Sequence, residues 1–444
     1  MTSQTILEDA RAAGSRDDEP RWLRDMRTRA ARRFEALGFP STRGEDWRYT
    51  STSSIAELDF RALREPGGDV EAADLTPFHF GAGGWTTLVF VNGRYDDALS
   101  SAGVESPGVT VLPYARAIDE MEDLVRDNLG TITSYEQNAF TALNTALHLD
   151  GAVIHVGRDM AAAAPIHLLF VSDANLAKGS AQPRVLIVAE RNSKATVVES
   201  YVSLGEATYF TNAVTEISLG DGATVAHYKI QRESPRSYHV GTVDVRQGRD
   251  SHLVQFSFAT GAALSRTNIY TTLAGEGCGA TLNGLYLGTG TQHVDHQTRI
   301  EHQAENCYSR EVYKGILDDT AHGVWNGKVY VHPEAQKTDG KQENHTLLLS
   351  DRAVIDTKPQ LEIFADDVKC THGATIGRID KAALFYMKSR GVGAARARQL
   401  LTYAFAADVL EKIELEPIRD TLEAIAMFRF TGEEQDDGTA AGSR

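Results

Sequence analysis

Four short segments of this 444-residue chain decide its fold, because they repeat one strand-like pattern: KATVVES at 194–200, GATVAHY at 222–228, DSHLVQF at 250–256 and GATLNGL at 279–285. Their second residues follow one another at steps of 28, 28 and 29. A second strand in each unit keeps a similar period, through Ile217, Val245, Leu273 and Ile300. A fixed period of this length, with two β-rich halves and no helix inside it, predicts a β-solenoid whose coils bury their apolar faces by stacking on one another.

The repeated region lies between two helical ends. We predict a mainly β protein with a right-handed parallel β-helix core at 151–378, between a mainly helical domain at 1–150 and a helical domain at 379–431. The polar residues 432–444 are expected to form a disordered tail. An antiparallel β-sandwich, whose short strands can also be evenly spaced, is the alternative. The end coils of a solenoid expose unpaired strand edges, which must be capped or must pair with another chain.

Local signals predict the elements at both ends. Apolar residues from Trp22 to Leu37 recur at three- and four-residue steps until Gly38, which predicts a helix. The run TTLVFVNGRYDD at 86–97 predicts a strand that turns at its Asn-Gly pair. Towards the C-terminus, two helices flank a glycine break at 391–393, and Pro417 suits the first turn of a last helix.

The composition limits the possible functions. The chain has 45 basic and 61 acidic residues and a formal net charge of −16, which disfavours binding to nucleic acid or anionic lipid. No run approaches the roughly 20 apolar residues of a membrane helix, and the first residues lack the pattern of an export signal. The three cysteines are too few and too far apart for a disulfide framework. We expect a cytoplasmic protein with no nucleic-acid or membrane partner.

The common catalytic motifs do not occur in the sequence. Neither Gly327-Lys328-Val329 nor Gly340-Lys341-Gln342 completes a P-loop, so we expect no nucleotide hydrolysis by the chain itself. The sequence QHVDHQT at 292–298 resembles a metal triad, but in a strand His293 and Asp295 face one side and His296 the other. We interpret these histidines as structural polar residues.

The segment DVKCTHGATIG at 367–377 contains Cys370 and His372, two positions apart. In an extended strand such a pair faces one side, with α-carbons about 6.5 Å apart. A thiolate and an imidazole together suit zinc, iron or an iron–sulfur cluster. Two ligands do not close a four-coordinate site, so the others would come from elsewhere in the fold or from a second chain. Spacing alone favours the simpler interpretation of a buried, unreactive cysteine beside a hydrogen-bonded histidine.

The stretch from Ser309 to Ile413 resembles the SufD family, subunits of the SUF iron–sulfur cluster assembly system. The matching text is SREVYKGIL, VWNGKVYV, LFYMKSRGV and the run AQKTDGKQENHTLLLSDRAVIDTKPQLEIFADDVKCTHGATIG, and EDWRYT near Trp47 is similar to the family's N-terminal signature. The paralogous SufB chains would carry a cysteine in the segment ENHTLLLSD, and Glu-His-Glu-Ala where this chain has Cys-Thr-His-Gly-Ala. The β-helix core between helical ends in this family agrees with the period.

The resemblance implies a non-catalytic scaffold subunit that pairs with a SufB-type subunit and docks SufC, an ABC-type ATPase. The position of His372 in C-x-H-G implies the functional histidine at the SufB interface, and Cys370 is a second, weaker candidate metal ligand. The expected cofactor is a transient iron–sulfur cluster shared with SufB, with none bound tightly to the isolated chain. Reduced flavin is associated with the family complex, but the sequence shows no flavin fingerprint. The implied contacts for SufC are Phe385, Tyr386, Arg390 and Gly391.

Two other functions stay open. A β-helix polysaccharide lyase or hydrolase would carry carboxylates aligned on the exposed face of successive coils. A self-contained metalloprotein would keep iron in the solitary chain. In the absence of a SufB-type partner, the exposed coil end also predicts a homodimer through paired edge strands.

Overall fold

The computed structural model describes residues 4–13, 19–63, 68–81 and 83–430. The tail predicted at 432–444 lies outside these described residues. The α-helices are α1 (Gln4–Ala13), α2 (Arg21–Leu37), α3 (Ser53–Glu57), α4 (Tyr114–Glu120), α5 (Glu122–Asn128), α6 (Ala139–Leu147), α7 (Lys381–Ser389), α8 (Ala394–Leu410) and α9 (Glu416–Phe428). Three short 3-10 helices are η1 (Glu45–Trp47), η2 (Ala72–Phe78) and η3 (Ala174–Leu176).

The strands form two sheets. The eleven-stranded sheet contains β1 (Arg61–Ala62), β4 (Val109–Pro113), β5 (Gly151–Val156), β7 (Gly179–Ala181), β8 (Arg184–Ala189), β10 (Phe210–Leu219), β12 (Tyr238–Gln247), β14 (Leu264–Leu273), β16 (His293–His302), β18 (His322–Val331) and β20 (Val354–Ile363). The ten-stranded sheet contains β2 (Thr86–Val91), β3 (Arg94–Ser101), β6 (Ile166–Ser172), β9 (Lys194–Ser203), β11 (Thr224–Arg232), β13 (His252–Ala259), β15 (Gly279–Gly288), β17 (Tyr308–Leu317), β19 (Asp339–Leu348) and β21 (Lys369–Gly377).

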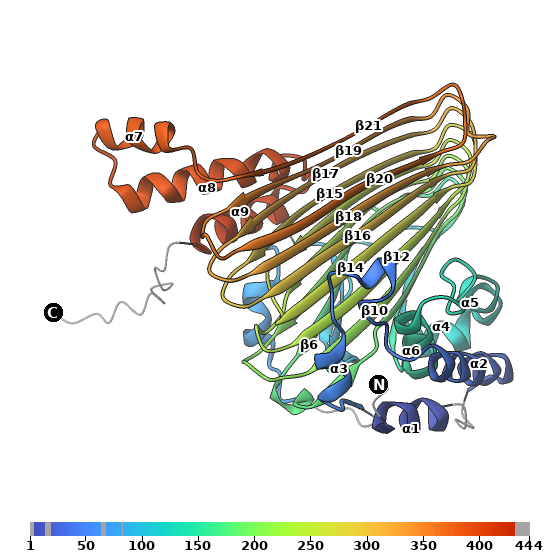
Figure 1. Ribbon diagram of the computed structural model, residues 1–444. Coiled ribbons are helices and arrows are strands. Elements are labelled where there is room, and N and C mark those ends of the chain that lie inside the picture. Colours follow the sequence, from blue (N-terminus) through green and yellow to red (C-terminus); the bar gives the residue numbers. More distant parts are fainter. Residues whose placement is uncertain (1–3, 14–18, 64–67, 82, 431–444) are drawn as a thin grey trace.

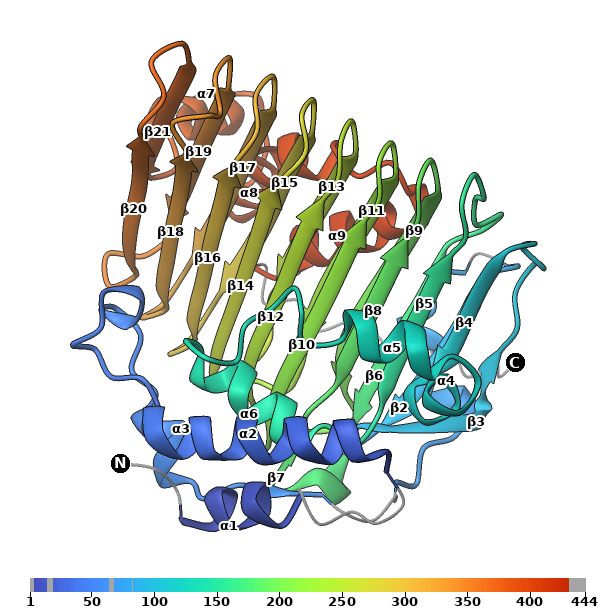
Figure 2. The same cartoon turned by 90° about the vertical axis from the view of Figure 1, so that its right-hand side faces the viewer.

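Successive long strands alternate between the two sheets, and each pairs in parallel with the strand two places before it. Figures 1 and 2 show the result, a flattened stack of coils that runs from β4 and β6 at one end to β20 and β21 at the other. This confirms the predicted mainly β fold with a parallel solenoid core and helical ends.

The predicted repeat is correct in period but slips by two residues in places. Lys194 pairs with Thr224 rather than with Gly222, and His252 pairs with Gly279. The cause is the turns, whose lengths differ from coil to coil while the strands stay in register. Because side chains in a strand alternate between faces, a slip of two leaves the predicted inward residues pointing inward.

Alternation along each strand separates the two faces of each sheet. In β9, Val197 packs between the sheets, whereas its neighbour Val198 packs on the outer face beneath the C-terminal helices. The core between the sheets continues through such residues as Leu282, Trp325 and Val329. Each coil therefore contributes apolar area to a core that no single coil could close.

Helices cover the sheets at both ends of the chain. Near the N-terminus, α1, α2 and α6 pack together and against the first residues of β10, β12 and β14. Figure 2 shows α1 and α2 crossing the stack of coils at this side. The predicted helix between Trp22 and Leu37 is confirmed as α2, which ends at Gly38 with φ 64°. The buried pair of Arg184 and Glu216 joins this helical layer to β8 and β10, since Glu216 also accepts hydrogen bonds from the backbone at 130–133.

The C-terminal helices α8 and α9 lie on the outer face of the ten-stranded sheet, where Val409, Leu410 and Leu422 join its apolar side chains. Lys314 of β17 donates a hydrogen bond to the carbonyl of Phe405 at 3.0 Å and pairs with Asp408 at 2.7 Å. Figure 1 shows that α7 is the helix that stands farthest from the solenoid. The predicted break between α7 and α8 is confirmed, with Gly391 at φ 85°.

The two ends of the solenoid differ. At the N-terminal end, β3 pairs antiparallel with β2 and β4 antiparallel with β5, so short reversed strands cover the first parallel strands. The predicted turn between β2 and β3 is confirmed, with Asn92 and Gly93 both at positive φ. At the C-terminal end, within the described residues, β20 and β21 each pair on one side only. The stack is thus capped at one end and open at the other.

Candidate functional site

The open coil end carries apolar surface beside its unpaired backbone. The exposed apolar side chains on or next to β20 and β21 are Val354, Ile363, Phe364 and Ile376. Native proteins usually protect a strand edge of this length with charges, bulges or a covering element. An edge that is both long and apolar favours pairing with another chain.

The backbone of β21 presents hydrogen-bond donors to the open side. The N–H of Lys369 bonds to the carbonyl of Thr338 at 2.8 Å, towards β19. In a parallel sheet, alternate residues direct their N–H and C=O groups to opposite neighbours. The groups that face the open edge therefore belong to Cys370, His372, Ala374 and Ile376.

The backbone of β20 is less complete as a pairing edge. The N–H of Val354 bonds to the carbonyl of Ala321, towards β18. By the same alternation, Pro359 occupies a position whose N–H would face the open side, and proline has none. Of the two terminal strands, β21 is the better template for a partner strand.

Cys370 lies on β21 with its thiol turned towards the interior. Its Sγ is 3.3 Å from the position that a Cβ at Gly340 would occupy, and Gly340 is its register partner in β19. The side chain is half-buried against the core, and this burial raises the pKa of the thiol. A protonated thiol packed on a glycine is a poor metal ligand as it stands.

His372 lies two residues further along the same face of β21. It is exposed, and its register partner is Gln342, which is fully buried. Gly340, Gln342 and Asn344 form the inward row of β19, so the row above them, with Cys370 and His372, lines the mouth of the open coil. Nothing in the local sequence marks Gln342 as important, because its link to His372 is visible only in the register.

This chain does not supply a full ligand set for a metal. In the residues that the structure describes, no group of three or more histidine, cysteine, aspartate or glutamate side chains could hold a metal ion. The pair on β21 therefore brings at most two ligands to a site that usually needs four.

The histidines of 292–298 have structural partners. His293 and Asp295 both meet the hydroxyl of Thr50, and Arg266 pairs with Asp295 at 2.7 Å. His296 faces the interior instead, where its ring lies 5.4 Å from that of Tyr286. His293 and Asp295 therefore face one side of β16 and His296 the other, as the alternation along a strand predicts.

The predicted partner contacts lie at the end of α7. Phe385 and Tyr386 are 74% and 59% exposed, the two largest values among the bulky apolar residues of the described chain. The guanidinium of Arg390 lies 5.2 Å from the ring centre of Tyr386. Exposed aromatic rings beside an arginine are typical of protein-binding surfaces.

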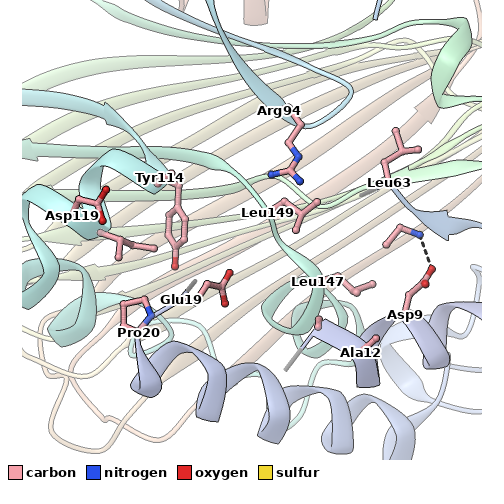
Figure 3. Close-up of a pocket in the computed structure, with 14 residues that line it drawn as sticks. Asp9, Ala12, Glu19, Pro20, Leu63, Arg94, Tyr114, Asp119, Leu147 and Leu149 are labelled. Carbon is pink, nitrogen blue, oxygen red and sulfur yellow. Dashed lines mark hydrogen bonds between the residues drawn. The ribbon is translucent and has the colours of Figure 1, made fainter. Parts of the chain in front are cut away.

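A cavity of about 560 Å³ lies on the far side of the molecule, between the N-terminal helices and the first coils. Figure 3 shows Arg94 and Tyr114 directed towards it, and Asp9, which accepts a hydrogen bond from the N–H of Ala62 at 3.0 Å. No histidine or cysteine is among its lining residues in the described part of the chain. Its chemistry does not suit an iron–sulfur cluster.

Two protein-family models match this chain, one over its N-terminal region and one over the solenoid core. The model of the SUF system FeS cluster assembly SufBD core domain matches residues 170–405, and that of the SufBD protein N-terminal region matches residues 9–168. The chain belongs to the SufBD family. Within this family it is of the SufD type, as the sequence resemblance implied.

Several curated relatives of this SufBD-family chain cover nearly its whole length. An iron–sulfur cluster assembly SufBD family protein from Synechocystis is 34% identical over 434 residues, 96% of this chain and 94% of the relative. The SufD proteins of Escherichia coli and Bacillus subtilis are 34% identical over 401 residues and 27% identical over 440 residues. These alignments cover 89% and 94% of this chain, and 90% and 96% of the relatives.

Membership of the SufBD family assigns the chain to iron–sulfur cluster assembly. This favours the assembly role over the polysaccharide-cleaving alternative. Among the described helices, none has the length and apolar character needed to cross a membrane.

Proposed function

We propose that this chain is a non-catalytic scaffold subunit of a SUF complex, which pairs through its open coil end with a SufB-type subunit and docks a SufC-type ATPase on α7 of its C-terminal helical domain. In this proposal His372 contributes one ligand to a transient cluster formed at the shared interface. The observation that carries the proposal is an exposed histidine at the mouth of an unpaired coil end, in a chain whose described residues cannot complete a metal site.

The pairing part of the proposal is supported by the backbone of β21. Its outward N–H and C=O groups, together with the exposed Ile376 and Phe364, suit strand addition from a second solenoid with a similar end. In the absence of a SufB-type partner, the same edge would pair with a second copy of this chain.

The cluster is cargo in this scheme, and the isolated chain is expected to hold none tightly. Cys370 would remain a secondary ligand, because its thiol is turned onto Gly340. The partner would supply the thiolates that this chain lacks, which accounts for a ligand set divided between two subunits.

The docking part of the proposal is supported by α7. Phe385, Tyr386 and Arg390 stand together on a helix that projects from the solenoid, with Gly391 forming the turn behind them. An ATPase bound there would supply the nucleotide hydrolysis for which this chain has no motif.

The unpaired state of Cys278, Cys307 and Cys370 agrees with a cytoplasmic location.

Recovery of the tagged chain at native expression levels tests this proposal. We expect an ABC-type ATPase and a second β-solenoid subunit to co-purify with it. Phe385→Asp is expected to lower recovery of the ATPase about fivefold while recovery of the second solenoid subunit is unchanged, because a charge replaces an exposed aromatic anchor. Phe428→Asp, on α9 and 50% exposed, is the matched control.

Quantitative mass spectrometry of the recovered proteins gives the measurement. Recovery of neither partner with the natural chain would overturn the proposed function. An equal loss of the ATPase in both phenylalanine variants would assign the effect to charge alone.

A further inference from the structure

A column of inward side chains leads from the core of the solenoid to His372. In the ten-stranded sheet, Leu282 of β15, Glu311 of β17, Gln342 of β19 and His372 of β21 are successive register partners. Paired residues on neighbouring strands are about 4.8 Å apart, so each side chain stacks on the next. Gln342 is therefore the residue directly beneath His372, and Glu311 lies directly beneath Gln342.

Gln342 is a buried amide without hydrogen bonds. Its exposed fraction is 0%, and neither its oxygen nor its nitrogen has a hydrogen-bond partner in the described part of the chain. A Cβ added at Gly327 of the facing strand β18 would collide with Gln342 Nε2. The amide thus occupies the space that the missing side chain of Gly327 leaves in the core. An unsatisfied buried amide costs about 1–3 kcal/mol.

Glu311, the register partner of Gln342 one coil below, is also a buried polar side chain. It is 1% exposed, and neither carboxyl oxygen makes a hydrogen bond of good geometry among the described residues. Burial raises the pKa of Glu311 to about 8, although the neighbouring hydroxyl of Thr298 partly opposes this rise, so its carboxyl group is largely neutral at pH 7. A neutral carboxyl group can accept a hydrogen bond from an amide N–H without placing a charge in the core.

Some other buried polar groups of the interior have hydrogen-bond partners, whereas the amide of Gln255 has none among the described residues. Glu199 accepts hydrogen bonds from Tyr201 at 2.7 Å and from Thr215 at 2.8 Å, and His227 Nε2 lies 2.8 Å from the same carboxylate. This network lies several coils away from the open end. His227 and Gln255 belong to the same column as Leu282, farther from the open end. Gln342 and Glu311 are the members of this column nearest to His372, so their unsatisfied atoms point to a role at that end.

We propose that Gln342 is a positioning residue for His372, held in place by Glu311. This inference rests on the proposed function of His372. A histidine that binds a metal through one ring nitrogen needs a partner for the N–H of the other, which fixes its tautomer and orientation. Once a partner subunit covers the coil end, the carbonyl oxygen of Gln342 accepts that N–H and the amide N–H of Gln342 donates to Glu311. Neither hydrogen bond is present among the described residues of the isolated chain. The lone pair of the other nitrogen then faces the interface.

The test uses the complex recovered with the tagged chain, freed of iron and labelled with 15N-histidine. Two-bond 1H–15N correlation spectra report the tautomer of each ring, and the signal that is lost in His372→Ala identifies His372. We expect one dominant tautomer in the natural chain and a mixture in Gln342→Met. Gln342→Glu, which keeps an acceptor, is expected to retain the dominant tautomer.

Cluster formation gives a second readout, which should fall about tenfold in Gln342→Met. Methionine has a volume similar to that of glutamine and removes two unsatisfied polar atoms, so the variant is expected to fold with at least the thermal stability of the natural chain. Glu311→Gln gives an independent check, with a smaller shift in the same direction.

The same tautomer ratio in Gln342→Met and in the natural complex would overturn the inference, whatever the cluster yield. The proposed function has a separate test, because it fails if His372→Ala forms clusters normally, whatever tautomer the spectra show.

Discussion

Replacing His372 with alanine is expected to reduce cluster formation by the assembled complex at least about a hundredfold, with no change in melting temperature or in subunit pairing. Loss of outer partners of a metal ligand already costs 10- to 100-fold, and this change removes the ligand itself. The side chain is exposed on a terminal strand, so its removal leaves no cavity in the core. Anaerobic reconstitution with ferrous iron and sulfide, followed by visible absorbance and acid-labile sulfide, gives the measurement.

His345→Ala is the matched control for this experiment. His345 lies on β19, faces outwards, and bonds to Thr375 at 2.7 Å and to Glu343 at 3.2 Å. It should form clusters as the natural chain does. Cys370→Ser should have a much smaller effect than His372→Ala, because the thiol packs on Gly340. Normal cluster formation in His372→Ala would show that the histidine is not a ligand, and aggregation of that variant would show that it is structural.

Ala374→Pro is expected to weaken pairing with the second solenoid subunit roughly ten- to a hundredfold. The N–H of Ala374 faces the open edge, so proline removes a donor from the interface but none from the ladder with β19. An acceptor on the partner strand would then be buried without a hydrogen bond, at a cost of about 1–3 kcal/mol. Gly373 precedes the substitution and accommodates the extended backbone that proline requires.

Affinity of the purified subunits, measured by sedimentation or by titration calorimetry, tests this prediction. Ala374→Ser keeps the N–H and should bind normally. Docking of the ATPase on α7 should be the same in both variants. Unchanged affinity in Ala374→Pro would show that the partner does not add a strand to β21.

The sequence predicts the type of fold well because each coil of the solenoid repeats the same pattern of apolar residues. Each coil must place apolar residues such as Val225 and Leu253 on its inner face, so the period survives even where a turn gains or loses two residues. The lengths of the turns are not repeated, and the register therefore could not be derived from the period. The alignment of Lys194 with Gly222, where the structure has Thr224, is the example.

The candidate site was only partly predictable for the same reason. Cys370 and His372 are neighbours in sequence, so their common face follows from strand geometry alone. Gln342 is 30 residues before His372, and Glu311 is 31 residues before Gln342. A period of 28 would have placed Asn344, not Gln342, beneath the histidine. The relation between these three residues depends on two coils of 31 and 30 residues, which are longer than the period of 28.

The difference between the two ends of the molecule also has a consequence for the size of the proposed assembly. A solenoid alike at both ends would add copies head to tail and grow into a filament. Here the first coil ends in the reversed strand β3, with Asp96 and Asp97, and in the five-residue strand β4. In the proposed assembly, two molecules that join through β21 would each use their open end, so growth would stop at two solenoids and the shape of the chain would fix the stoichiometry.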